Sequence, residues 1–205
     1  SNLDAKVREK TRIELKNLLS KIGIASVYVT HDQEEAFLLS DKIVVMNQGS
    51  IIQVDTPYNI YHYPANEFVA SFVGKSNMID GMVVSKKARG RGTVRILGQY
   101  DIDCEVPDLL PEGSACSVII RANEVGMLDE KPKTGNIIPC EVESREYKGA
   151  VTDHIVKVGN VSLTVTTHRF CELNHVHPDE SMRGRKAFLD IRGEAVTIVP
   201  KDVTQ

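Results

Sequence analysis

One short apolar run constrains the fold of this chain most strongly. It extends from Ser26 to Thr30, has Val27-Tyr28-Val29 at its centre and leads into Thr30-His31-Asp32. A continuous β-branched run that ends in polar residues predicts a strand buried on both faces, as in a parallel sheet covered by helices. Such a sheet needs several strands, and only one run of this kind precedes the change in composition. We therefore expect an α/β segment whose other strands lie upstream of Ser1, so that the sequence is a C-terminal fragment.

His31 follows the predicted strand, where open α/β sheets collect their ligands. Asp32 can cap the next helix, and Glu35 completes a capping-box-like Asp-x-x-Glu pattern. The positive end of that helix disfavours an imidazolium and attracts anions such as phosphate. One interpretation is a neutral His31 that donates an N–H to a phosphoryl oxygen. The other is a structural histidine that is hydrogen-bonded at a strand end.

Residues 1–74 are predicted to alternate helices and strands. Capping residues and a Gln48-Gly49 turn define the elements. The expected ranges are a helix at 4–22, a strand at 26–30, a helix at 33–39, a hairpin of 43–48 with 50–54, and short helices after Thr56-Pro57 and after Asn66.

The composition changes after Gly74 to short β-like runs with Gly or Pro between them, which is typical of an all-β sandwich or barrel. The clearest runs are 82–84, 93–97, 102–106, 116–121, 155–158 and 161–166. Residues 118–128 also align weakly with residues 189–199, and each ends an all-β segment. Two such halves can interleave to close one small barrel; chance similarity is the alternative.

The formal net charge of −3 predicts no general attraction to nucleic acid or to an anionic membrane. No apolar stretch approaches the roughly 20 residues that span a bilayer.

The four cysteines are scattered, which indicates reduced cytosolic thiols; they are Cys104, Cys116, Cys140 and Cys171. Cys171, His175 and His177 form a possible metal cluster, and His168 lies nearby in the sequence. Their spacing matches no standard zinc pattern, so we expect an exposed His-x-His without a metal ion.

Two motifs support a specific family. Residues 1–8, Ser-Asn-Leu-Asp-Ala-Lys-Val-Arg, resemble the D-loop of ATP-binding cassette (ABC) ATPases, and residues 28–36 resemble their switch-histidine segment. Residues 40–53 resemble the strand pair that closes the nucleotide-binding domain. Residues 56–74 resemble the connector of importer ATPases that carry a C-terminal regulatory extension.

The resemblance extends into the β region. Ile120-Arg121-Ala122-Asn123-Glu124-Val125 is similar to an element of the TOBE (transport-associated OB) extension, and residues 143–149 are similar to its Glu-Tyr-x-Gly strand. Ala122 and Asn123 depart from the usual Pro-Glu. The implied domains are residues 1–74, the C-terminal part of an ABC nucleotide-binding domain, and residues 75–205, an OB-like regulatory β domain. The sugar, polyamine and ferric-iron importers are not separated by these motifs.

The resemblance implies roles for particular residues. His31 would be the switch histidine that contacts the γ-phosphate and orients water. The D-loop, which crosses the dimer interface toward the partner's nucleotide, would consist of Ser1, Asn2, Leu3 and Asp4; Asp4 could also cap the following helix. The parent protein would hydrolyse ATP with Mg and form a homodimer. It would join transmembrane permease subunits at the cytoplasmic face of the membrane, and reach a substrate-binding protein through them.

Several motifs that ATP hydrolysis requires do not occur in this sequence. It has no Gly-x4-Gly-Lys-Ser/Thr phosphate loop, no apolar strand ending in Asp-Glu and no Leu-Ser-Gly-Gly-Gln signature. Catalysis of phosphoryl transfer consists almost entirely of positioning and electrostatics, so this chain alone is expected to be inactive.

The alternative function is a free-standing OB-type module that binds a small ligand or nucleic acid. Two basic runs could serve nucleic acid, residues 86–91 and 183–186. Neither is interleaved with the aromatic residues on which bases stack, so no nucleic-acid partner is expected.

Overall fold

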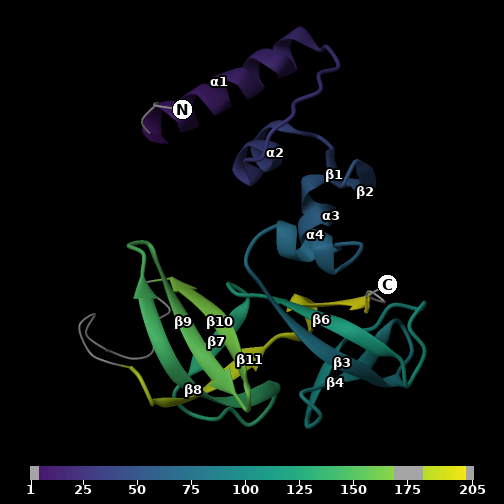
Figure 1. Cartoon of the computed structure of the whole chain (residues 1–205), viewed down its shortest axis with the longest axis vertical. Coiled ribbons are helices and arrows are strands. Elements are labelled where there is room, and N and C mark those ends of the chain that lie inside the picture. The colour runs from purple at the N-terminus through teal and green to yellow at the C-terminus, as the bar shows by residue number, and fades with distance from the viewer. Residues whose placement is uncertain (1–4, 169–181, 202–205) are drawn as a thin grey trace. The chain divides into compact units, whose positions relative to one another are not determined.

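The computed structural model describes residues 5–168 and 182–201. They divide into two compact units, Ser1–Ala65 and Asn66–Gln205 (Figure 1). Helix α4 (Glu67–Phe72) contacts strands of the second unit, and its Ala70 packs in a small apolar cluster with Ile119 and Val199. The assignment of residues 1–74 to a nucleotide-binding domain stays a prediction.

The first unit contains most of the elements that the sequence predicts. Their bounds are α1 Ala5–Ile22, α2 Gln33–Leu39, β1 Ile43–Asn47, β2 Ser50–Asp55 and α3 Pro57–His62. Gln48 and Gly49 have φ values of 47° and 82°, so the β1–β2 turn uses the left-handed backbone that two-residue hairpins favour. Thr56 caps α3 by accepting a hydrogen bond from the Asn59 amide at 3.3 Å.

The strand predicted at residues 26–30 is wrong. This segment is irregular, and Val27 and Val29 are 95% and 92% exposed. A strand buried on both faces needs a neighbour on each side to pair its N–H and C=O groups. None of the strands in the described residues pairs with this segment, so its apolar side chains have no sheet to enter.

The second unit is an all-β, OB-like domain built from two five-stranded antiparallel sheets (Figure 1). Sheet 1 has the order β12 (Val196–Pro200), β6 (Ala115–Arg121), β3 (Ser76–Lys86), β4 (Arg91–Ile96) and β5 (Tyr100–Glu105). Sheet 2 has the order β7 (Val125–Leu128), β11 (Lys186–Ile191), β8 (Asn136–Tyr147), β9 (Val151–Val158) and β10 (Val161–His168). Each sheet curls, so that β5 approaches β12 and β10 approaches β7.

The internal repeat is confirmed by the strand register. Ile120 of β6 pairs with Val196 of β12, and their counterparts in the repeat, Ile191 of β11 and Val125 of β7, pair in the same way. Each half therefore contributes its last strand to the sheet of the other half. The interleaving is as expected, but it produces two sheets over one shared apolar core rather than one small barrel.

Two asparagines link the sheets at equivalent positions. The Asn77 side chain donates to the Thr164 carbonyl at 2.8 Å and accepts from the Thr164 amide at 2.7 Å. Asn136 makes the same pair of bonds with the backbone of Asp103, at 3.1 and 2.9 Å. Each amide thus satisfies the backbone of an edge strand that belongs to the other half.

Three cysteines lie within the shared core. Burial raises the pKa of the Cys104 thiol to about 12, and those of Cys116 and Cys140 to about 11. These thiols stay protonated at neutral pH and pack as small apolar groups, as the sequence predicts. Cys171 lies outside the described residues.

Candidate functional site

His31 lies in the turn that leads into α2, between Thr30 and Asp32, and its side chain is exposed. Asp32 is the N-cap of α2, because its Oδ1 accepts hydrogen bonds from the amides of Glu34 at 3.0 Å and Glu35 at 3.3 Å. The predicted cap is therefore confirmed. It holds the residue next to His31 against the start of a helix.

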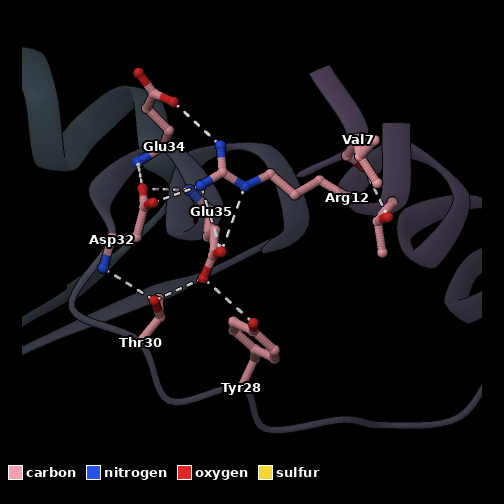
Figure 2. Close-up of polar contacts among 8 residues, drawn as sticks. Val7, Arg12, Tyr28, Thr30, Asp32, Glu34 and Glu35 are labelled. Atoms are coloured by element: carbon pink, nitrogen blue, oxygen red, sulfur yellow. Dashed lines mark hydrogen bonds and ion pairs between the residues drawn. The ribbon is translucent and has the colours of Figure 1, made fainter. Parts of the chain in front are cut away.

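Arg12 of α1 meets three carboxylates around this turn, and we call Arg12, Asp32, Glu34 and Glu35 the Arg12 cluster. Figure 2 shows the guanidinium between them. Its Nη2 donates to Asp32 Oδ2, and its Nη1 donates to Glu34 Oε2 at 3.1 Å. Nε and Nη2 both reach Glu35 Oε1 at 3.4 Å. The cluster joins α1 to α2 across the turn that carries His31.

Glu35 extends this network to the residues before His31. Its Oε2 accepts hydrogen bonds from Thr30 Oγ1 at 2.7 Å and from the Tyr28 hydroxyl at 3.2 Å (Figure 2). The Asp32 amide donates to Thr30 Oγ1 at 2.9 Å. The capping box is thus only half formed: Thr30, rather than Glu35, satisfies the backbone N–H of the cap residue.

The network holds two of its carboxylates, Asp32 and Glu35, in the charged form. Partial desolvation alone raises the pKa of Asp32, but the Glu35 and Glu34 amides and the Arg12 guanidinium outweigh it, so the net pKa lies below its usual value. The Thr30 hydroxyl is the largest influence on Glu35 and, with Tyr28 and Arg12, lowers its pKa against the opposing effect of desolvation. At neutral pH Asp32 and Glu35 are therefore charged beside the Arg12 guanidinium.

Arg12 and Thr30 were missed by the sequence reasoning, which singled out His31, Asp32 and Glu35. The contacts of Arg12 join residues 20 to 23 positions apart, and Thr30 contacts Asp32 and Glu35 at 2 and 5 positions; the sequence motifs considered do not predict these pairs. One signal was present: Arg12 is an arginine in the middle of α1, two positions from Lys10, which pairs with Glu14 on the exposed surface of the helix.

The other predicted site residues lie outside the part of the chain that the structure describes. These are Ser1, Asn2, Leu3 and Asp4, and also Cys171, His175 and His177. Within residues 5–168 and 182–201, no group of three or more His, Cys, Asp or Glu side chains is arranged to hold a metal ion. Of the predicted site, the described residues thus contain the exposed imidazole of His31 on its turn.

Part of the positive charge of the basic runs of the second unit is paired within the fold. Lys87 pairs with Asp103 at 3.3 Å, and Lys86 Nζ donates to the Pro107 carbonyl at 3.0 Å. Arg185 pairs with Asp129 at 2.7 Å. None of the helices in the described ranges combines the length and the apolarity needed to cross a bilayer.

No protein-family model matches the chain. Curated relatives do match. The spermidine/putrescine import ATP-binding protein PotA of Lawsonia intracellularis is 40% identical over 158 residues, which are 76% of this chain and 43% of that protein. PotA 2 of Pseudomonas aeruginosa is 34% identical over 203 residues, 96% of this chain and 51% of that protein. The chain spans about half the length of the curated relatives it matches.

A solved structure supports the fold of the second unit. It is that of the cytoplasmic molybdate-binding protein ModG with molybdate bound, with a TM-score of 0.51, 15% identity, and coverage of 60% of this chain and 96% of that one. At this identity the likeness shows the fold alone. The motifs at residues 1–8 and 28–36, the curated relatives and this β fold agree. The chain therefore matches the C-terminal part of ABC importer ATP-binding proteins, including an OB-like TOBE extension.

Proposed function

We propose that this chain is the C-terminal portion of the ATP-hydrolysing subunit of a bacterial ABC importer. The observation that carries the proposal is the match to PotA 2 of Pseudomonas aeruginosa, which covers 96% of this chain and so includes both units. In this function residues 1–4 serve as the D-loop, His31 as the switch histidine, and the second unit as a regulatory and dimerising domain.

His31 would act on the terminal phosphate of ATP. Its exposed imidazole stands on a turn that is held on both sides, by Thr30 and by the Asp32 cap. A ring nitrogen so placed can hydrogen-bond a phosphoryl oxygen and orient an attacking water. The residues that cradle the phosphates and bind magnesium are not in this sequence, so the chain by itself is not expected to hydrolyse ATP.

His31→Gln is expected to abolish most of the ATPase activity of a complete subunit. The test uses a chimeric protein in which the N-terminal part of Pseudomonas aeruginosa PotA 2 is joined to this chain at Ser1. Loss of the positioned imidazole should lower kcat for ATP hydrolysis about 100-fold, with KM for ATP little changed, because the ring acts on the transferred phosphate and the water. Steady-state phosphate release measures both constants.

The matched control is His62→Gln, a second histidine of the first unit, which should leave kcat near that of the unaltered chimera. The 205-residue chain alone serves as the blank. Equal kcat values for the His31→Gln chimera and the unaltered chimera would contradict the proposed role of His31.

The second unit is proposed to form a homodimer through residues after Gly74. Met78, Met82 and Val84 lie on one face of β3, with Asp80 between the first two, and are 44%, 51% and 38% exposed. A second copy of the unit would cover these three apolar side chains. Light scattering at tens of micromolar should give a dimer for the chain and a monomer for Met82→Glu, whereas Lys157→Glu on β9, an exposed position in the other sheet, should stay dimeric. A monomeric unaltered chain would contradict the proposal.

The remaining assignments follow from the relatives. The parent subunit is proposed to use ATP and Mg, and to bind transmembrane permease subunits at the cytoplasmic face of the membrane. The relatives' names make a polyamine the proposed solute.

A nucleic-acid-binding OB module has less support, because Lys87 and Arg185 are paired with acids within the fold.

A further inference from the structure

We propose that Arg12 is a positioning residue that holds the turn of His31 in its working conformation. The inference rests on the proposed role of His31 in ATP hydrolysis. Helix α1 directly follows the Ser1–Asp4 motif in the sequence. In this inference it also fixes the turn of His31, within the switch-histidine motif of residues 28–36.

The geometry shows how one side chain can hold the turn. Arg12 uses Nε, Nη1 and Nη2 on three different carboxylates, so its planar fork is fully engaged. Two of those carboxylates connect Arg12 to the two neighbours of His31. Asp32 is the residue that directly follows His31, and Glu35 accepts a hydrogen bond from Thr30, which directly precedes it. Moving the guanidinium therefore disturbs the backbone on both sides of His31.

Burial separates these contacts from ordinary surface ion pairs. The side chains of Arg12, Glu35 and Asp32 are 12%, 19% and 30% exposed, whereas Glu34 is 85% exposed. Surface pairs contribute little because both charges remain hydrated and mobile. Here the guanidinium is largely removed from water and reaches acceptors that the α2 cap holds in place, so its bonds are directional and persistent.

The charge balance gives the turn a second reason to depend on Arg12. With Arg12 present, three carboxylates share one guanidinium; without it, no other cation among the described residues forms a salt bridge with Asp32 or Glu35. Neighbouring negative charges that lose their shared cation repel each other. The turn is then expected to open, and Asp32 to lose its preferred orientation as the cap.

A residue that only stabilises the fold would not act through His31, and this difference can be measured. The test uses the chimeric protein described above, with Arg12→Gln, His31→Gln and the double variant. If Arg12 positions His31, Arg12→Gln should lower kcat about 10- to 100-fold with KM for ATP nearly unchanged. The double variant should be no slower than His31→Gln alone, because a misplaced His31 and an absent one are equivalent.

Two further variants complete the test. Arg12→Lys keeps the charge but loses the fork, so it should recover only part of kcat. Lys10→Gln removes a charge from the exposed face of the same helix, where Lys10 meets Glu14, and should leave kcat unchanged.

The outcomes separate the inference from the function on which it rests. A large effect of His31→Gln with no effect of Arg12→Gln would overturn the inference and leave the proposed function intact. Losses that multiply in the double variant would also overturn it, because Arg12 would then act independently of His31. If His31→Gln has no effect, the proposed function fails, and the inference fails with it.

Discussion

Arg121→Ala is expected to lower the free energy of unfolding of the second unit by about 3–5 kcal/mol. Arg121 is 4% exposed, and its Nη1 donates to the carbonyls of Ala70, at 2.9 Å, and Val73, and to Ser76 Oγ at 2.5 Å. These acceptors lie at the end of α4 and the start of β3. Truncation leaves them without a charged donor, and each such bond contributes about 1.5–3 kcal/mol, not independently.

Urea unfolding followed by the β-sheet circular dichroism signal measures this effect. Arg121→Lys should be intermediate, since it keeps the positive charge but its ammonium is not placed as the Nη1 of Arg121 is. Arg95→Ala is the matched control, because Arg95 forms an exposed pair with Asp101 on β5, and it should cost less than about 1 kcal/mol. A loss for Arg121→Ala no greater than that of Arg95→Ala would show that the contacts of Arg121 contribute little. Faster amide exchange in residues 67–73 of Arg121→Ala would locate the damage at α4.

Asp153→Asn is expected to destabilise the second unit by about 2–3 kcal/mol at neutral pH. The Asp153 side chain is 5% exposed; its Oδ2 accepts from Lys148 at 2.6 Å and Lys75 at 2.8 Å, and its Oδ1 accepts from Thr166 at 2.5 Å. Lys75 and Lys148 are about half exposed and so keep part of their hydration, which limits the loss when the carboxylate becomes an amide.

The same group predicts a pH dependence. Burial alone raises the pKa of Asp153, but the bonds from Lys148, Lys75 and Thr166 outweigh it and hold the pKa well below its usual range. A carboxyl with a lower pKa in the folded state stabilises that state above its unfolded pKa of about 4, and the contribution disappears as the pH falls through the folded value. The stability difference between the unaltered chain and Asp153→Asn should therefore be constant above about pH 5 and shrink steadily below about pH 4.

Urea midpoints between pH 7 and pH 2 test this dependence. Asp80→Asn, which removes an exposed partner of Lys201, should change stability by less than about 1 kcal/mol. A difference between Asp153→Asn and the unaltered chain that stayed the same down to pH 2 would contradict a charged, paired Asp153.

Local patterns predicted the caps and turns because the physics behind them is local. Asp32, Thr56 and Asn66 cap the helices that follow them, each through bonds to amides two or three residues away. Gln48-Gly49 turns the hairpin as predicted. The repeat between residues 118–128 and 189–199 was visible as matching apolar positions, since paired strands must bury equivalent faces.

The candidate site was predictable in part. His31 and the Asp32 cap followed from neighbouring residues, whereas Arg12 contacts partners 20 to 23 positions away, which only packing of α1 against α2 brings within reach. The strand expected at residues 26–30 shows the opposite error: Val27 and Val29 have strand character, but a strand forms only where other strands accept its hydrogen bonds.

The sequence by itself determined the similarity to ABC importer ATP-binding proteins, the helix starts, the turns and the duplicated β pattern, because those properties depend on residue identity and short-range bonding. The tertiary structure alone decided which half donates which strand, how Asn77 and Asn136 join the two sheets, and which charges meet at Arg12 and Asp153. These contacts join residues far apart in the chain. Their geometry exists only once the core has closed and has removed water from around them.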